Sequence, residues 1–187
     1  MNARRIVVLG LAIVVCAVPA AVVAGNIGQA GSQPGLVQQV QEVTRNFRDV
    51  NNAIAAGYVS LGSCISGPEE GAMGIHYARE ELIGDGAIQV DQPELLVYEQ
   101  RGGRLRLLGV EYLVPAELWA ATNPAPPVLV GQHFQFVNTP NRYGLPAFYE
   151  LHVWAWKHNS KGTFVDWNPA VSCDDYTGEP AAEHTGH

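Results

Sequence analysis

The chain has 187 residues, of which 47% are hydrophobic and 16% are charged, and its formal net charge is −7 at pH 7. This length and hydrophobic content suit one domain with a continuous core. The negative charge argues against nucleic acid or an anionic membrane surface as a partner. We also expect the protein to be a monomer.

Residues 1–24 are predicted to be a signal peptide for export. Arg4 and Arg5 form a short basic start, and an apolar run over residues 6–23 ends in small residues, as signal peptidase prefers. The run is also just long enough to span a bilayer, so an uncleaved membrane anchor is the alternative. We therefore expect a secreted or extracytoplasmic protein that has no membrane contact beyond this segment, with a linker over residues 25–34.

Cys64 and Cys173 are the two cysteines that follow the predicted signal. An exported protein meets an oxidising compartment, so a disulfide between them is the default expectation. Two unpaired buried thiols are the alternative, and neither cysteine has the C-x-x-C spacing typical of metal-binding thiolates. We expect a single domain over residues 35–173 and a disordered acidic tail over residues 174–187.

An amphipathic helix is predicted at the start of the domain. Apolar residues recur at alternating spacings of four and three from Leu36 to Ile54, which is the pattern of one buried helical face. Pro34 suits the first turn of this helix, and Gly57 suits its C-terminal cap. The pattern indicates one helix that packs against a sheet.

Beyond Tyr58, short β-rich runs separated by glycine, proline and asparagine predict a mostly antiparallel sheet. Tight turns are expected at residues 101–103 and 159–162, and an irregular crossing is expected over residues 115–127. The predicted strands cover residues 87–90, 95–99, 105–114, 128–137, 148–157 and 163–167. The predicted fold class is therefore α+β, with the N-terminal helix packed on a curved sheet or small β-barrel.

The most informative stretch covers residues 148–158. At strand spacing, Glu150, His152, Trp154 and Trp156 point to one face of the predicted strand. Burying a carboxylate and an imidazole is costly unless each is paired, hydrogen-bonded or bound to a metal. The stretch therefore indicates a polar site inside the fold.

Three four-residue elements share a pattern in which a glycine comes two positions before a potential ligand and an aromatic residue follows it. Their potential ligands are His76, Glu111 and His133. If the elements lie on neighbouring strands, the glycines permit close backbone approach and the aromatic rings point to the opposite face. With Glu150 and His152, these residues supply three imidazoles and two carboxylates, a set that suits zinc, copper, iron or manganese.

The sequence therefore predicts a divalent transition-metal centre, with zinc or copper as first candidates. His76, His133 and His152 would be its nitrogen ligands, and Glu111 or Glu150 its oxygen ligand. An open coordination position would allow metal-activated water, with either glutamate as general base. Two alternatives remain: a buried Glu–His pair satisfied by tyrosine hydroxyls or backbone, and a metal-free acid/base site.

The tryptophans support a second hypothesis, a non-catalytic binding domain. Trp154 and Trp156 would line a cleft, with Trp119 and Trp167 at its mouth, and such a cleft would suit a glycan or a small apolar ligand. Core packing is the alternative explanation for these side chains. The sequence contains no G-x-S-x-G, P-loop or dinucleotide fingerprint.

Several segments carry a resemblance to other proteins. They are AGY at 56–58, Cys64, MGIHY at 73–77, GVEY at 109–112, and HVWAWKHNSKGTFVDWNPAVSC at 152–173. In these segments the chain resembles a group of exported bacterial proteins known only as hypothetical. The resemblance implies a single exported domain that extends to Cys173, and it implies no activity.

Overall fold

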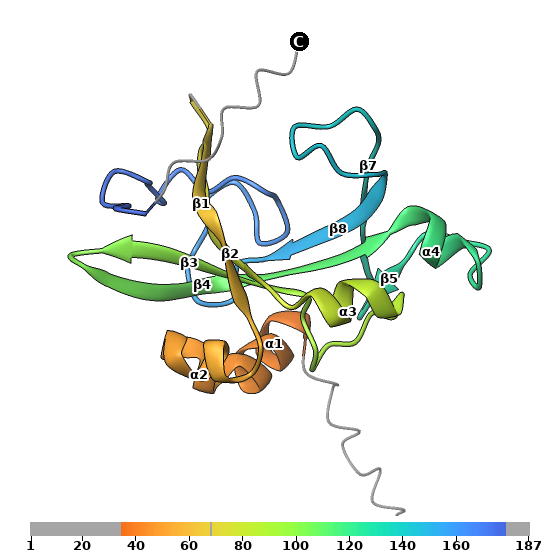
Figure 1. Ribbon diagram of the computed structural model, residues 1–187, viewed down its shortest axis with the longest axis horizontal. Helices are drawn as coiled ribbons and strands as arrows, with labels where there is room; N and C mark the ends of the chain where they lie inside the picture. The colour runs from red at the N-terminus through yellow and green to blue at the C-terminus, as the bar shows by residue number, and fades with distance from the viewer. Residues whose placement is uncertain (1–34, 68, 179–187) are drawn as a thin grey trace, which may run out of the picture. The chain divides into compact units, whose positions relative to one another are not determined.

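The computed structural model describes residues 35–67 and 69–178, which are coloured in Figure 1. The predicted signal segment, the predicted linker and the last part of the predicted tail, residues 179–187, lie outside the described residues.

A six-stranded antiparallel sheet forms the centre of the described domain, with the strand order β1-β2-β3-β4-β8-β7. Within the described residues the sheet is curled but stays open, because β1 and β7 are its edges (Figure 1). The α+β prediction therefore holds in outline, without a closed barrel. The strands are β1 (Val59–Gly67), β2 (Gly71–Ala78), β3 (Leu95–Arg101), β4 (Arg104–Pro115), β7 (Gln135–Val137) and β8 (Phe148–Val153).

Smaller elements connect these strands. A two-stranded sheet pairs β5 (Val128–Leu129) with β6 (Gln132–His133). The short helices α3 (Glu80–Asp85) and α4 (Ala116–Ala120) lie between β2 and β3 and after β4. The predicted strands at 87–90 and 163–167 are irregular segments instead.

The segment predicted as one helix is divided into three. It consists of α1 (Leu36–Thr44), the 3-10 helix η1 (Arg45–Arg48) and α2 (Val50–Ala55). The break between η1 and α2 lies at Asp49. This residue has an extended backbone, and its side chain accepts a hydrogen bond from Asn51 N at 3.0 Å. A side-chain cap of this kind starts a new helix rather than continuing the old one. Figure 1 shows α1 and α2, in orange, on one side of the strands.

The helix-covered face of the sheet holds the main hydrophobic core. Two buried tyrosines of this core fix neighbouring segments: Tyr98 Oη donates to Phe47 O at 2.6 Å, and Tyr112 Oη donates to Val90 O at 2.8 Å. The core includes the buried side chains of Leu36, Val40, Ala53, Tyr58, Ile75, Tyr77, Leu96, Tyr98, Val110, Tyr112, Leu151 and Val153.

The opposite face carries the polar side chains, because neighbours along a strand alternate between faces. On β8, Glu150 and His152 point away from the core that contains Leu151 and Val153. Two smaller apolar clusters flank this polar group. One contains Ala72, Val97, Leu108, Trp154 and Val171, and the other contains Ala78, Leu95, Leu113 and Phe148.

Strand β8 ends at Val153, earlier than the predicted end at residue 157. The chain leaves the sheet there, since Trp154 N donates to Thr163 O at 3.0 Å and Trp156 N donates to Leu108 O at 2.8 Å. The strand spacing predicts that Trp156 shares a face with His152. This prediction is wrong, because Trp156 lies beyond the end of β8.

Cys64 and Cys173 form the predicted disulfide, with their sulfur atoms 2.03 Å apart. It joins the edge strand β1 to the C-terminal segment. A disulfide indicates an oxidising, extracytoplasmic environment. Among the described helices, none has both the length and the apolar character needed to cross a bilayer.

The residues just after Cys173 pack against the β3–β4 hairpin. Gly102 N donates to Asp175 Oδ2 at 3.2 Å, and Thr177 N donates to Gln100 Oε1 at 3.3 Å. The predicted disordered tail therefore has an ordered start.

Glu94, just before β3, is a buried carboxyl with 1% of its surface exposed. Its Oε2 accepts a hydrogen bond from Leu113 N at 3.2 Å. Burial raises the pKa of Glu94 from 4.5 to about 8. Between these two pH values the folded protein keeps a proton that the unfolded chain releases, so the stability due to this group falls as the pH rises.

We predict that Glu94→Gln makes the protein relatively more stable at high pH, because the amide keeps an acceptor for Leu113 N and cannot ionise. Its free energy of unfolding should exceed that of the wild type by on the order of 2–4 kcal/mol at pH 9 and by much less at pH 5. Urea unfolding at both pH values measures this difference, with Glu117→Gln on the exposed side of α4 as control. Parallel pH profiles of Glu94→Gln and wild type would contradict the prediction.

Candidate functional site

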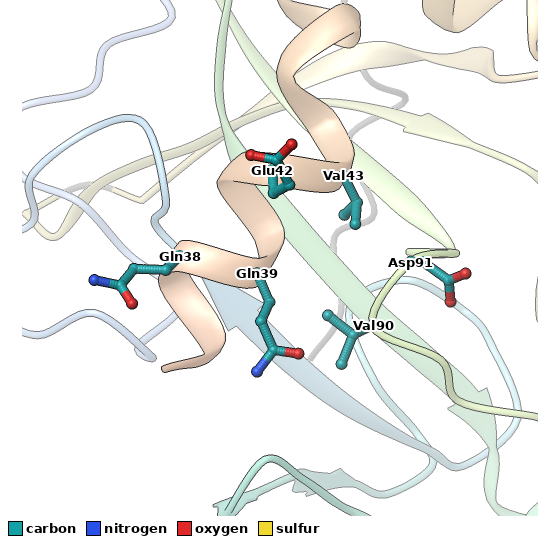
Figure 2. A pocket seen from close by; sticks show the side chains of 6 residues that line it. All are labelled: Gln38, Gln39, Glu42, Val43, Val90 and Asp91. Atoms are coloured by element: carbon teal, nitrogen blue, oxygen red, sulfur yellow. The ribbon is translucent and has the colours of Figure 1, made fainter. Parts of the chain in front are cut away.

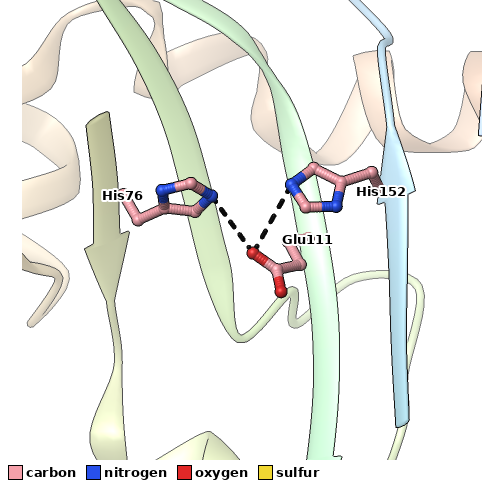
Figure 3. A group of neighbouring side chains, drawn as sticks. All are labelled: His76, Glu111 and His152. Carbon is pink, nitrogen blue, oxygen red and sulfur yellow. Dashed lines mark ion pairs between the residues drawn. The ribbon is translucent and has the colours of Figure 1, made fainter. Parts of the chain in front are cut away.

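Three polar side chains from three strands meet on the face of the sheet opposite α1 and α2. They are His76 of β2, Glu111 of β4 and His152 of β8 (Figure 3). The Nε2 atoms of His76 and His152 lie 3.2 Å and 3.6 Å from the same oxygen, Glu111 Oε2. All three residues are buried, with 3%, 5% and 2% of their surface exposed in chain order. The structure thus brings together three of the side chains that the sequence predicts as ligands.

Strand register explains the meeting. Glu111 and His152 are direct partners across β4 and β8. On the other side, β3 lies between His76 and Glu111, where it pairs Val97 with His76 and Leu95 with Glu111. The imidazole of His76 therefore reaches over an aliphatic strand towards the carboxylate of Glu111.

Two glycines allow the strands to approach closely around the site. Gly74 has φ +109°, and a Cβ atom there would lie 2.5 Å from Tyr98 O. At Gly109 a Cβ atom would collide with Val153 O. The close approach predicted from the repeated glycine pattern is therefore found at two of its three glycines. At Gly131 nothing lies within 4 Å of an added Cβ atom.

Opposite charges stabilise Glu111 and His152 in this buried place. Burial disfavours the charged form of Glu111, but His152 and then His76 outweigh it and hold the pKa of Glu111 well below its usual range. Burial likewise favours neutral His152, but the negative charge of Glu111 outweighs it and raises the pKa of His152 to about 9. Without a metal, Glu111 and His152 are therefore an ion pair at pH 7.

Glu150 is a second buried carboxyl beside this pair. It precedes His152 by two residues on β8, and 3% of its surface is exposed. Burial and then the negative charge of Glu111 raise the pKa of Glu150 to about 8, so it is protonated at pH 7. The carboxyl groups of Glu150 and Glu111 are close enough for each to shift the pKa of the other. The two glutamates thus hold different protonation states side by side.

Several imidazole nitrogens of the site lack hydrogen bonds. His76 Nδ1 and both ring nitrogens of His152 are buried and have no hydrogen-bond partner among the described residues. Buried polar atoms without a partner are uncommon and need an explanation. An ion between the Nε2 atoms and Glu111 Oε2 would account for His152 Nε2 but not for the two Nδ1 atoms.

His133 does not join this group. It is exposed on β6, which pairs with β5 in the separate small sheet. Val130 and Gly131 have φ values of +48° and +80° and turn the chain between these strands, where the sequence predicts one continuous strand. The described residues contain one group suited to a metal, and it consists of His76, Glu111 and His152.

Asp166 is a site residue that sequence reasoning misses. Its Oδ1 lies 3.6 Å from His152 Nδ1, on the side of the ring away from Glu111. It belongs to the run TFVDW at 163–167, which the sequence pattern predicts as a strand. An acidic residue within an aromatic run is the only sequence signal that could indicate it.

Trp154 and Trp156 lie in different environments. Trp154 packs in the cluster with Val97, and its ring stacks against His152 with centroids 6.3 Å apart. Trp156 packs against the main core, and its Nε1 donates to Thr44 Oγ1 at 3.0 Å. They therefore do not line a common cleft.

A groove on the other side of the domain holds no tryptophan among the residues described. It lies between α1 and the loop before β3, and its volume is about 590 Å³ (Figure 2). Its lining consists of Gln38, Gln39, Glu42, Val43, Val90 and Asp91.

Comparisons with models of protein families, with curated proteins and with solved structures find no match. The function is therefore inferred from the chemistry of the site.

We predict that the two glutamates differ sharply in their contribution to the stability of the metal-free protein at pH 7. Glu111→Gln removes the negative partner of buried His152 and should lower the free energy of unfolding by about 3 kcal/mol. Glu150→Gln replaces a protonated carboxyl with a neutral group of the same shape and should cost less than about 1 kcal/mol. Urea unfolding with a chelator present measures both losses, and equal losses would contradict the charge assignment.

Proposed function

We propose that this protein binds one divalent transition-metal ion through His76, Glu111 and His152. The observation that supports the proposal most directly is that one ligand atom from each residue lies within 4.8 Å of the others in a buried site. The lack of a hydrogen-bond partner at His152 Nε2, which faces Glu111 Oε2, also favours it. Such an atom is costly to bury unless something binds it.

The distances between donor atoms fit a small ion. Zinc bonds to nitrogen and oxygen are about 2.0–2.2 Å long, so neighbouring donors around a tetrahedral zinc lie about 3.3–3.6 Å apart. Glu111 Oε2 is 3.2 Å from His76 Nε2 and 3.6 Å from His152 Nε2. Small side-chain rotations are therefore enough to seat an ion between the three groups.

The donor set favours zinc or copper and is also compatible with iron or manganese. It offers two imidazoles and a carboxylate, and both Cys64 and Cys173 are bonded to each other rather than free as thiolates. A divalent cation would supply the positive charge that protonated His152 otherwise supplies to Glu111. Glu150 is a candidate for a fourth ligand, since it is buried on β8 two residues from His152 and its pKa is raised by the charge of Glu111.

All these groups are buried. This favours a closed structural metal site over a catalytic site that is open to a large substrate. We also propose that residues 1–24 direct export, which the disulfide between Cys64 and Cys173 supports. The alternative for the site is a metal-free ion pair of Glu111 and His152.

Metal loading of protein purified without a His tag tests the proposal. After chelator treatment and dialysis against zinc or copper, elemental analysis should find about one ion per chain. His76→Ala and His152→Ala should each weaken zinc binding by at least about 100-fold, which exceeds the usual loss for residues around the ligands. Competition with a chromophoric chelator measures the affinity.

His133→Ala is the matched control, because His133 is exposed on β6 and lies outside the group. It should bind zinc as the wild type does. Wild-type protein that takes up no stoichiometric ion, or an equal loss in all three histidine variants, would overturn the proposal.

A further inference from the structure

We infer that Asp166 is a positioning residue that orients His152 for metal binding, and that Gln135 holds Asp166 in place. The inference rests on the proposed metal site and identifies two residues that do not touch the ion.

Carboxylate oxygens lie on both sides of the His152 ring. Glu111 Oε2 is 3.6 Å from Nε2, and Asp166 Oδ1 is 3.6 Å from Nδ1. A histidine that binds a metal through Nε2 carries its proton on Nδ1, and a carboxylate behind Nδ1 commonly fixes that arrangement. The observed separation exceeds a hydrogen bond by a few tenths of an ångström, so a small rotation of the ring closes it.

Gln135 fixes the position of the Asp166 carboxylate. Gln135 Nε2 donates to Asp166 Oδ1 at 2.6 Å, the same oxygen that faces His152. Gln135 lies on β7 and pairs with Glu150 of β8, two residues from His152. The carboxylate is therefore held from the same sheet that carries the histidine.

Trp154 fixes the segment that carries Asp166. Trp154 N donates to Thr163 O at 3.0 Å, and Trp154 Nε1 donates to Val165 O at 2.6 Å. The Trp154 ring also stacks on His152 with an angle of 21° between the planes. Gln135 and Trp154 together therefore determine where Asp166 lies.

His76 has no equivalent support among the described residues, since its one ion pair there is made through Nε2 to Glu111 and none is made through Nδ1. The site is therefore asymmetric, with a carboxylate behind the imidazole of His152 and none behind that of His76. Removal of the Asp166 carboxylate should therefore alter metal binding through His152 and leave His76 unaffected.

The test uses full-length protein loaded with zinc or with cobalt(II), whose visible absorption bands report the ligand geometry. Asp166→Asn should weaken zinc binding by about 10–100-fold and alter the cobalt bands. Asp166→Glu, which keeps a carboxylate, should recover part of this loss. Gln135→Ala removes one hydrogen bond at an exposed residue and should weaken zinc binding by about 3–10-fold.

Asp174→Asn is the control, because it removes the same charge from an exposed residue. It should leave the zinc affinity and the cobalt bands unchanged, and urea unfolding of each metal-free variant shows whether the fold persists. If Asp166→Asn and Gln135→Ala only lower stability, with wild-type affinity and cobalt bands, the inference is overturned while the proposed function stands. If the wild type binds neither metal, the proposed function itself fails.

Discussion

The register between β4 and β8 is the constraint on which the rest of the site depends. It places Glu111 directly beside His152, and a shift of one residue would send these side chains to opposite faces of the sheet. A buried carboxylate without a positive partner would consume a large part of a domain's stability. His152 provides that partner, and His76 Nε2 lies 3.2 Å from the same carboxylate oxygen. The same pairing therefore stabilises the sheet and creates the polar site.

Alternation along the chain is enough to predict which face the central side chains occupy, but it does not predict where the strands end. The pattern places Glu150 and His152 together, as the structure does. It also extends the strand to residue 157, whereas β8 stops at Val153. Hydrogen bonds to distant segments, such as Trp156 N to Leu108 O, turn the chain there. Strand β1 is rich in glycine and serine, and β2 contains two glycines, so strand pairing rather than β propensity defines them.

The candidate site is partly predictable for the same reason. His76, Glu111 and His152 lie on strands of one sheet, so a pattern of glycines and polar residues can indicate them. His133 carries the same local pattern, but the turn at Val130 removes it to another sheet. Asp166 lies in an irregular segment placed by side-chain hydrogen bonds from other parts of the chain. No periodicity encodes contacts of that kind, and only the structure reveals them.

The central claim is that two imidazoles and a carboxylate of this sheet bind one ion. X-ray absorption spectroscopy at the zinc edge of stoichiometrically loaded protein tests it most directly, because the spectrum identifies the atoms bonded to zinc. We expect two imidazole nitrogens and a carboxylate oxygen at about 2.0–2.2 Å from zinc. Zinc surrounded by oxygen alone, or bonded to sulfur at about 2.3 Å, would contradict it.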